Sequence, residues 1–364
     1  MAFLTAMAAL RPLALMAMLV LTTGCQAGYV LRSAWSQADL LLSRKSIEKI
    51  LNSPETDRAQ SPEDLAKLRL ALEAKDFAEK HLGLKKTGNY TSFVQLDRPY
   101  VSYIVSAAKR DELTFHRWWF PIVGHVPYKG YFNPELAKEE ARDMEADGYD
   151  TYVRGTSAYS TLGWFEDPVL SSMLRYSNYD LVNLIIHETV HATIYIKSEA
   201  DFNERLATFL GDLGAELFFK TKEGEHSLTL KDAHDDREDE ERFSGFISRE
   251  IDGLRKWYEA EPNKEAPDFL ERRRKRFELI LASFDKTLAP QIKNSRYRDR
   301  LRRDLSPDVL NNASLLAWRL YVYDLSDFKQ AFKKLGSDPI RFLEFAKSLE
   351  KEAAPEAKLK EFTR

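Results

Sequence analysis

Residues 184–195 read LIIHETVHATIY and contain the pattern His-Glu-x-x-His, formed by His187, Glu188 and His191. Residues four positions apart lie on one face of an α-helix, so both imidazoles can bind the same ion. Neutral imidazole nitrogens bind Zn²⁺ at about 2.0–2.1 Å, and catalytic zinc sites commonly have three protein ligands. Glu188 points to a neighbouring face of the helix, where it can reach a water on the metal. The stretch therefore predicts a zinc site with Glu188 as the catalytic base.

The alternative interpretation of this stretch is purely structural. In it, both histidines would be core residues hydrogen-bonded to carbonyl groups, and Glu188 would lie on the rim. Glutamate is rarely buried without a partner, and Glu188 is surrounded in sequence by Ile185, Ile186 and Val190. This setting favours the metal site.

The third ligand is expected from the next helix, which begins after a break near residues 198–201. Glu204 lies thirteen residues after His191, far enough for the chain to reverse and bring a second helix against the first. Residues 203–207 have the form N-E-x-x-A, which resembles the glutamate helix of gluzincin peptidases, although the connection in those enzymes is several residues longer. The acids that could replace Glu204 as a ligand are Glu199, Asp201 and Asp212.

Such a site predicts hydrolysis of an amide bond. Two histidines and a glutamate leave one position of the ion for water, whose pKa falls to about 7 on zinc. Glu188 would accept the proton of this water and pass it to the departing amine. A further donor would stabilise the oxyanion, and Tyr159, Tyr195 and Tyr321 are the candidates. Other divalent ions also suit this ligand set, so availability decides between them.

The N-terminal residues differ from the rest of the chain. Residues 13–21 read LALMAMLVL, follow Arg11 and precede Thr-Thr-Gly-Cys, which is typical of a signal peptide over residues 1–24. Residues 21–25 resemble a bacterial lipobox, although Thr22 replaces the usual aliphatic residue. We therefore expect lipidation of Cys25, the only cysteine, and anchoring to a membrane without a spanning helix. Plain secretion and an uncleaved anchor are the alternatives. Gln26 follows the cysteine, and the absence of Asp at this position resembles outer-membrane sorting in Gram-negative bacteria.

Composition and periodicity predict a mixed α/β (α+β), predominantly helical fold in one domain, residues 25–364. The net charge is −3, with 54 basic and 57 acidic residues, so no bulk field attracts nucleic acid. Helical periodicity dominates the N-terminal part, 26–85, and the C-terminal part, 228–364. Aromatic and β-branched clusters in 88–132 and 149–165 indicate strands.

Five segments together resemble the bacterial putative aminopeptidase lipoprotein family, and they span most of residues 24–330. They read GCQAGYVLRSAWSQADLLL, FPIVGHVPYKGYF, YVRGTSAYSTLGWFEDPVLSSML, LIIHETVHATIYIKSEADFNERLATFLGD and LNNASLLAWRLYVYDLSDF. The resemblance implies a zincin-like peptidase with one Zn²⁺ and a small sheet packed on the HExxH helix. It also implies that a peptide substrate pairs with an edge strand near Arg154, Ser157 and Ala158. The alternatives are that this segment is an ordinary core strand and that Arg154 pairs with Asp150 or Glu166 rather than with a substrate carboxylate.

The resemblance favours Tyr321 slightly over Tyr159 as the oxyanion donor, because Tyr321 lies on a late helix shared with the family. The leading hypothesis is an aminopeptidase anchored to the outer membrane and facing the periplasm. An endopeptidase of the same metal chemistry and a non-catalytic metal-binding lipoprotein are the alternatives. The G-x-M-E-N element that captures the substrate amine in one large aminopeptidase family is absent. The intact Glu188 disfavours a non-catalytic role, because structural zinc needs no base.

Overall fold

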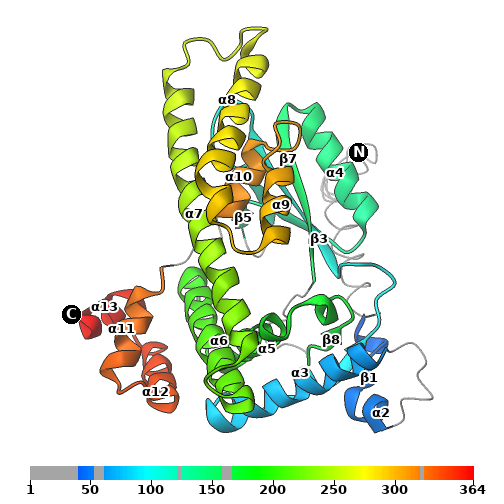
Figure 1. Ribbon diagram of the computed structural model, residues 1–364, viewed down its shortest axis with the longest axis vertical. Helices are drawn as coiled ribbons and strands as arrows, with labels where there is room; N and C mark the ends of the chain where they lie inside the picture. Colours follow the sequence, from blue (N-terminus) through cyan, green and yellow to red (C-terminus); the bar gives the residue numbers. More distant parts are fainter. Residues whose placement is uncertain (1–39, 53–60, 121–123, 158–165, 320–323) are drawn as a thin grey trace, which may run out of the picture. The chain divides into compact units, whose positions relative to one another are not determined.

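The computed structural model describes residues 40–52, 61–120, 124–157, 166–319 and 324–364 (Figure 1). The chain divides into two compact units, residues 1–44 and residues 45–364. Only residues 40–44 of the first unit are described. All features discussed below belong to the second unit.

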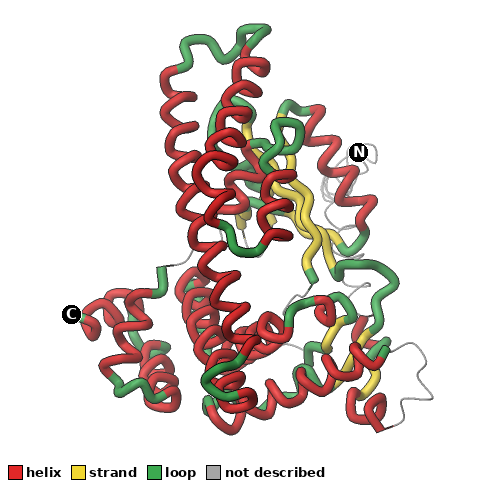
Figure 2. The backbone as a smooth tube through the Cα atoms, viewed as in Figure 1, coloured by secondary structure: helices red, strands yellow, loops and turns green. Residues whose placement is uncertain are grey.

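Helices make up most of the second unit (Figure 2), which confirms the predicted predominantly helical, mixed α/β class. The α-helices are α2 (Ile47–Asn52), α3 (Pro62–His81), α4 (Pro134–Ala146), α5 (Asn178–Thr193), α6 (Ala200–Glu223), α7 (Leu228–Ala260), α8 (Phe269–Ser283), α9 (Ser295–Asp304), α10 (Asn312–Arg319), α11 (Ser326–Lys334), α12 (Pro339–Leu349) and α13 (Pro355–Thr363). The predicted pair of helices separated near residues 198–201 is thus confirmed as α5 and α6.

The described strands are short and form three small sheets, with orders β1-β2-β8, β6-β3-β7 and β4-β5. The strands are β1 (Lys45–Ser46), β2 (Ser92–Val94), β3 (Ser102–Lys109), β4 (Trp118–Phe120), β5 (Gly124–Val126), β6 (Lys129–Tyr131), β7 (Tyr149–Thr156) and β8 (Val169–Leu170). The longest pairing is antiparallel, between β3 and β7. Among the described strands β7 therefore lies at a sheet edge, as the sequence predicts for this segment.

The sheet β6-β3-β7 packs against α4 and α10. Its buried residues include Ala107 and Ala108 of β3, and α4 contributes Ala137 and Ala141. Small side chains let these two layers approach closely. The expectation that the sheet would pack on the HExxH helix is therefore wrong for this sheet. Helix α5 packs instead mainly against α6 and α3.

Glycines allow the close approach of α5 and α6. A Cβ atom at Gly211 would lie 3.2 Å from the Cβ atom of His187 and 3.2 Å from the carbonyl oxygen of Asn183. At Gly214, a Cβ atom would lie within 3.0 Å of the Ile186 side chain. Helix α6 thus contacts α5 through its glycine face, which brings the backbone of α6 close to His187.

A buried network of charged and polar groups fixes the helices α7, α8 and α10 to β7. Arg273 of α8 forms an ion pair with Asp150 of β7 and donates from Nε to the Tyr258 hydroxyl at 2.9 Å. Tyr258 in turn donates to Asn312 at 2.9 Å, and the Asn312 backbone N–H donates to Asp150 at 2.9 Å. The charges of this network are compensated inside it, as burial requires.

Candidate metal centre

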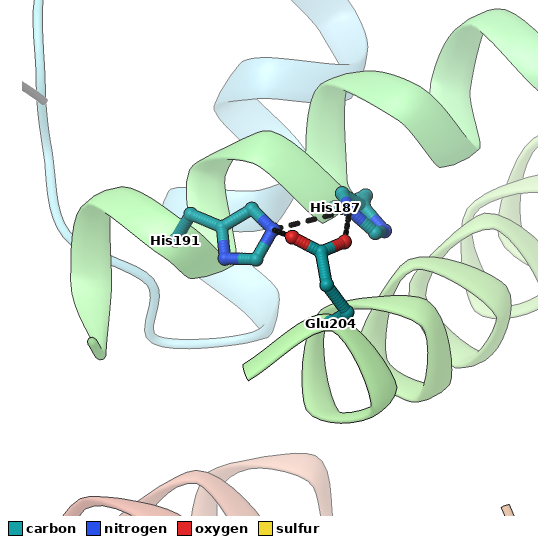
Figure 3. Close-up of side chains that lie close together, drawn as sticks. All are labelled: His187, His191 and Glu204. Carbon is teal, nitrogen blue, oxygen red and sulfur yellow. Dashed lines mark hydrogen bonds and ion pairs between the residues drawn. The ribbon is translucent and has the colours of Figure 1, made fainter. Parts of the chain in front are cut away.

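Three side chains from α5 and α6 converge on one point (Figure 3). The Nε2 atoms of His187 and His191 lie 3.2 Å apart. Glu204 places one carboxylate oxygen 3.5 Å from His187 Nε2 and the other 3.4 Å from His191 Nε2. Within the described ranges these residues form the one group of three or more His, Cys, Asp or Glu side chains arranged to hold a metal.

The separations of these donor atoms fit a divalent ion. Ligand atoms about 2.0–2.1 Å from a tetrahedral ion lie about 3.3–3.4 Å from one another. The two imidazole nitrogens lie 3.2 Å apart, and each lies 3.4–3.5 Å from a different oxygen of the Glu204 carboxylate. With one ligand atom from each residue, all three donors lie within 4.8 Å of one another, which is close enough to share one ion. Neutral imidazoles and a carboxylate are also the donor types that zinc prefers. The pKa of Glu204 lies well below its ordinary value, so its carboxylate is anionic. The hydrogen bond with His187 is the largest cause, and that with His191 is the next.

The helix α5 is positioned by its cap and its apolar face. The side chain of Ser177 accepts a hydrogen bond from the Asp180 backbone N–H and caps the helix start. Ile185, Ile186 and Val190 are buried, and the histidines occupy a different face of the same helix. His191 is almost completely buried, and its Nδ1 atom has no hydrogen-bond partner in the described structure. The ring is therefore held by packing and by the contacts of Nε2.

Asn203 closes the loop that joins α5 to α6. Its side-chain oxygen accepts from the Ile196 backbone N–H at 2.9 Å, and its side-chain nitrogen donates to the Ile196 carbonyl at 2.7 Å. Both groups are buried, so water does not compete for these bonds. Because Asn203 directly precedes Glu204, the same clamp fixes the helix turn that carries the carboxylate.

Replacing Asn203 by alanine is expected to lower the free energy of unfolding by about 2–4 kcal/mol, because two buried peptide groups lose their partners. The change should also weaken binding of Zn²⁺ by freeing the Glu204 turn. Denaturant unfolding and a metal titration measure the two effects. The matched change Asn263→Ala, at an exposed loop residue, should alter neither quantity appreciably. Equal behaviour of the two variants would contradict the role of the clamp.

Arg205, the residue after Glu204, ties the start of α6 to the C-terminal helices. Its Nη1 atom donates to both carboxylate oxygens of Glu356 in α13, each at 2.9 Å. Its Nε atom donates to the backbone carbonyl of Asp324 at 2.9 Å, just before α11. Both contacts to Glu356 come from one guanidinium nitrogen, and the Nε bond to Asp324 adds a second point of attachment. Residues 324–364 thus hold the helix end that carries one candidate ligand.

Glu188 has the surroundings expected of a base. Its Oε2 atom is buried and has no hydrogen-bond partner in the described structure, and the residue lines the same cavity as His187. A buried carboxylate oxygen without a partner is costly, and such atoms are found at catalytic sites. Tyr90 is buried as well, and the pKa of its phenol lies well above the ordinary value. Burial is the largest cause, and the negative charge of Glu188 is the next.

Tyr90 is a neighbour of the site that the sequence did not reveal. It adopts a left-handed backbone conformation with φ 60°, and its backbone N–H donates to the Asp167 carbonyl at 2.7 Å. Such a conformation is uncommon for a tyrosine and is often found near functional sites. No motif distinguishes Tyr90 in the sequence, because its approach to Glu188 depends on contacts between residues far apart in the chain.

A cavity of about 930 Å³ opens beside the three-residue cluster. Its walls come from α5, α6, α7 and α9, and His187 and Glu188 lie in its lining. This volume is at the upper end of the usual range for small-molecule sites, about 300–1,000 Å³. Asp212 also lines the cavity, but its Oδ1 atom accepts from Asn183 at 2.8 Å and Arg237 at 3.2 Å. Burial raises the pKa of Asp212.

The acids that were weighed against Glu204 do not belong to the cluster. Glu199, Asp201 and Asp212 are not among the three converging donors. Glu199 occupies the position before the first residue of α6, and Asp201 lies in the first turn. The structure therefore selects Glu204 as the carboxylate beside both histidines.

Three of the residues predicted for substrate binding or oxyanion stabilisation, Tyr195, Arg154 and Ser157, lie in the described part of the chain, and none of them lines the cavity. Tyr195 is 49% exposed and does not line the cavity. Arg154 lies on the edge strand β7 opposite Ile104, and the carbonyl of Ser157 accepts a hydrogen bond from Ser172. Asp150, an alternative partner of Arg154, pairs with Arg273.

Four other predicted residues lie outside the described residues: Cys25, Ala158, Tyr159 and Tyr321. Their roles in lipidation, substrate binding and oxyanion stabilisation therefore stay predictions.

The fold and the site thus define a protein with a candidate centre for a divalent cation beside a large cavity. The chain belongs to the family described as “Putative aminopeptidase”, whose model matches residues 28–360. Membership of this family indicates peptidase activity. Comparison with curated proteins and with solved structures gave no significant match. None of the described helices combines the length and the apolar character needed to cross a bilayer.

Proposed function

We propose that this protein is a zinc-dependent aminopeptidase. The observation that carries the proposal is the convergence of His187, His191 and Glu204, whose ligand atoms lie within 4.8 Å of one another. His187 and Glu188 line the adjoining cavity. The two histidines and Glu204 would hold the ion. The family supports peptide as the substrate class.

In the proposed reaction, the bound ion supplies a Lewis acid that polarises the substrate carbonyl and makes water more acidic. Glu188 accepts the proton of the attacking water at its carboxylate and then delivers it to the leaving amine. The burial of its Oε2 atom supports this role, because an oxygen without a protein partner is free to accept a proton.

Capture of a free amino group requires an acid near the reacting bond, and the cavity contains several. Asp232, Asp236 and Glu240 lie four positions apart on α7, so they share one face, and all three line the cavity. Asp180 joins them from the first turn of α5. An ammonium group entering this space would find carboxylate partners, which supports exopeptidase action on the amino end of a peptide.

The test is hydrolysis of a short peptide by the zinc-loaded protein, compared with the same peptide acetylated at its amino end. We expect the free peptide to be cleaved with a kcat/KM at least about tenfold higher, because acetylation removes a charge-assisted contact. A chelator should abolish both reactions, and added Zn²⁺ should restore them. Equal cleavage of the two peptides would identify an endopeptidase. Absence of cleavage with zinc bound would refute the peptidase proposal.

Attachment to the outer membrane, facing the periplasm, remains a prediction from the residues around Cys25. A lipid on this cysteine would hold the peptidase at a membrane surface.

A further inference from the structure

Three arginines of α9 line the cavity that contains Glu188. Arg296, Arg300 and Arg303 are spaced four and three positions apart, so they lie on one face of the helix. All three side chains are exposed to solvent. The cavity therefore has an arginine face, defined by these three residues, in addition to the acids of α7.

None of the three arginines forms an ion pair with any residue in the described part of the chain, whereas two other arginines of the same helix do. Arg298 pairs with Asp299 at 3.3 Å, and Arg302 pairs with Asp285 at 2.7 Å. Like charges three and four positions apart destabilise a helix by a few tenths of a kcal/mol per pair. The unpaired positive charges are thus concentrated on the face that lines the cavity.

The acids of α7 do not neutralise this face by direct contact. Asp236 accepts a hydrogen bond from Asn294 at 2.8 Å. Neither Asp236 nor Glu240 comes within ion-pair distance of an α9 arginine in the described structure, although both line the same cavity. Arg300 instead lies over the ring of Tyr297, 5.0 Å from its centroid. The cavity thus presents carboxylates on one helix and guanidinium groups on another.

We infer that the arginine face binds a carboxylate of the peptide substrate, which restricts the enzyme to short peptides with a free carboxyl end. The inference rests on the proposed peptidase function. Guanidinium groups bind carboxylates through two parallel hydrogen bonds, and they remain charged at any physiological pH. A short peptide carries an ammonium group at one end and a carboxylate at the other, and the cavity offers a partner for each. Its volume suits a few residues rather than a protein.

The experiment compares three peptides that share a free amino end and a sequence of four residues. The first has a free C-terminal carboxylate, the second is its amide, and the third is an amide with glutamate as its last residue. The zinc-loaded protein, the double variant R300Q/R303Q and the control variant R298Q are assayed with each peptide. Arg298 lies on the same helix but does not line the cavity, so R298Q controls for loss of charge.

We expect the wild-type protein and R298Q to show a KM about tenfold lower for the free carboxylate than for its amide. R300Q/R303Q should remove this difference by raising the KM of the free peptide alone. A low KM for the glutamate amide as well would mean that a side-chain carboxylate also satisfies the site.

Hydrolysis of all peptides without discrimination, or discrimination that survives in R300Q/R303Q, would overturn the inference while leaving the peptidase function intact. Failure of the wild-type protein to cleave any peptide would instead refute the proposed function.

Discussion

Replacing Glu188 by glutamine is expected to lower kcat for peptide hydrolysis by about 10²–10⁴-fold, the usual contribution of general acid–base catalysis. Glutamine has almost the same shape as glutamate but accepts a proton poorly. Glu188 is not one of the three converging donors, so the variant should retain its metal. Steady-state kinetics combined with elemental analysis of the purified variant measures both properties.

The matched control for this prediction is Glu199→Gln. Glu199 lies immediately before α6 and outside the three-residue cluster, so its loss should leave kcat within about twofold of the wild-type value, as expected for a surface substitution. If the variant at position 188 retained full activity with metal bound, the proposed base would be wrong. Loss of metal from that variant would contradict its placement outside the ligand set.

Replacing Glu204 by glutamine is expected to abolish stabilisation of the fold by Zn²⁺. An ion that binds only the folded state, and whose free concentration is about 1,000 times its Kd, stabilises that state by about 4 kcal/mol. Glutamine removes the negative charge between His187 and His191, and two imidazoles alone give a weaker site. Thermal unfolding with chelator and with added Zn²⁺ should show a large difference in Tm for the wild type and almost none for the variant.

Asp201→Asn provides the control for the Glu204 variant, because Asp201 belongs to the same helix turn and was an alternative ligand. This variant should keep the full response of Tm to zinc. A normal zinc response in Glu204→Gln, or its loss in Asp201→Asn, would show that the assignment of the third ligand is wrong. Parallel titrations with other divalent ions would rank their affinities for the site.

The candidate metal centre was predictable because its geometry is local. His187 and His191 occupy one helix, where a spacing of four residues fixes their common face. Glu204 could be located because a break of only a few residues separates α5 from α6, which forces the two helices to pack side by side. The start of α4 is also marked in the sequence, since Asn133 caps the helix and Pro134 begins it.

The surroundings of the centre depend on contacts that no local pattern encodes. Tyr90 reaches the vicinity of Glu188 from nearly a hundred residues earlier, through a turn with positive φ. The arginines of α9 come from about a hundred residues later, and no sequence motif distinguishes them. The resemblance implied a small sheet packed on the HExxH helix, but the sheet β6-β3-β7 packs against α4 and α10.

The link between Arg205 and Glu356 couples helix α13 to the candidate metal centre. Coupling free energies are reciprocal, so whatever orders α13 also favours the ligand-bearing turn, and an ion held by that turn favours an ordered α13. Purification tags or truncations that perturb α13 would therefore yield preparations with weakened metal affinity. Such preparations would be mistaken for an inactive protein unless metal occupancy was measured alongside activity.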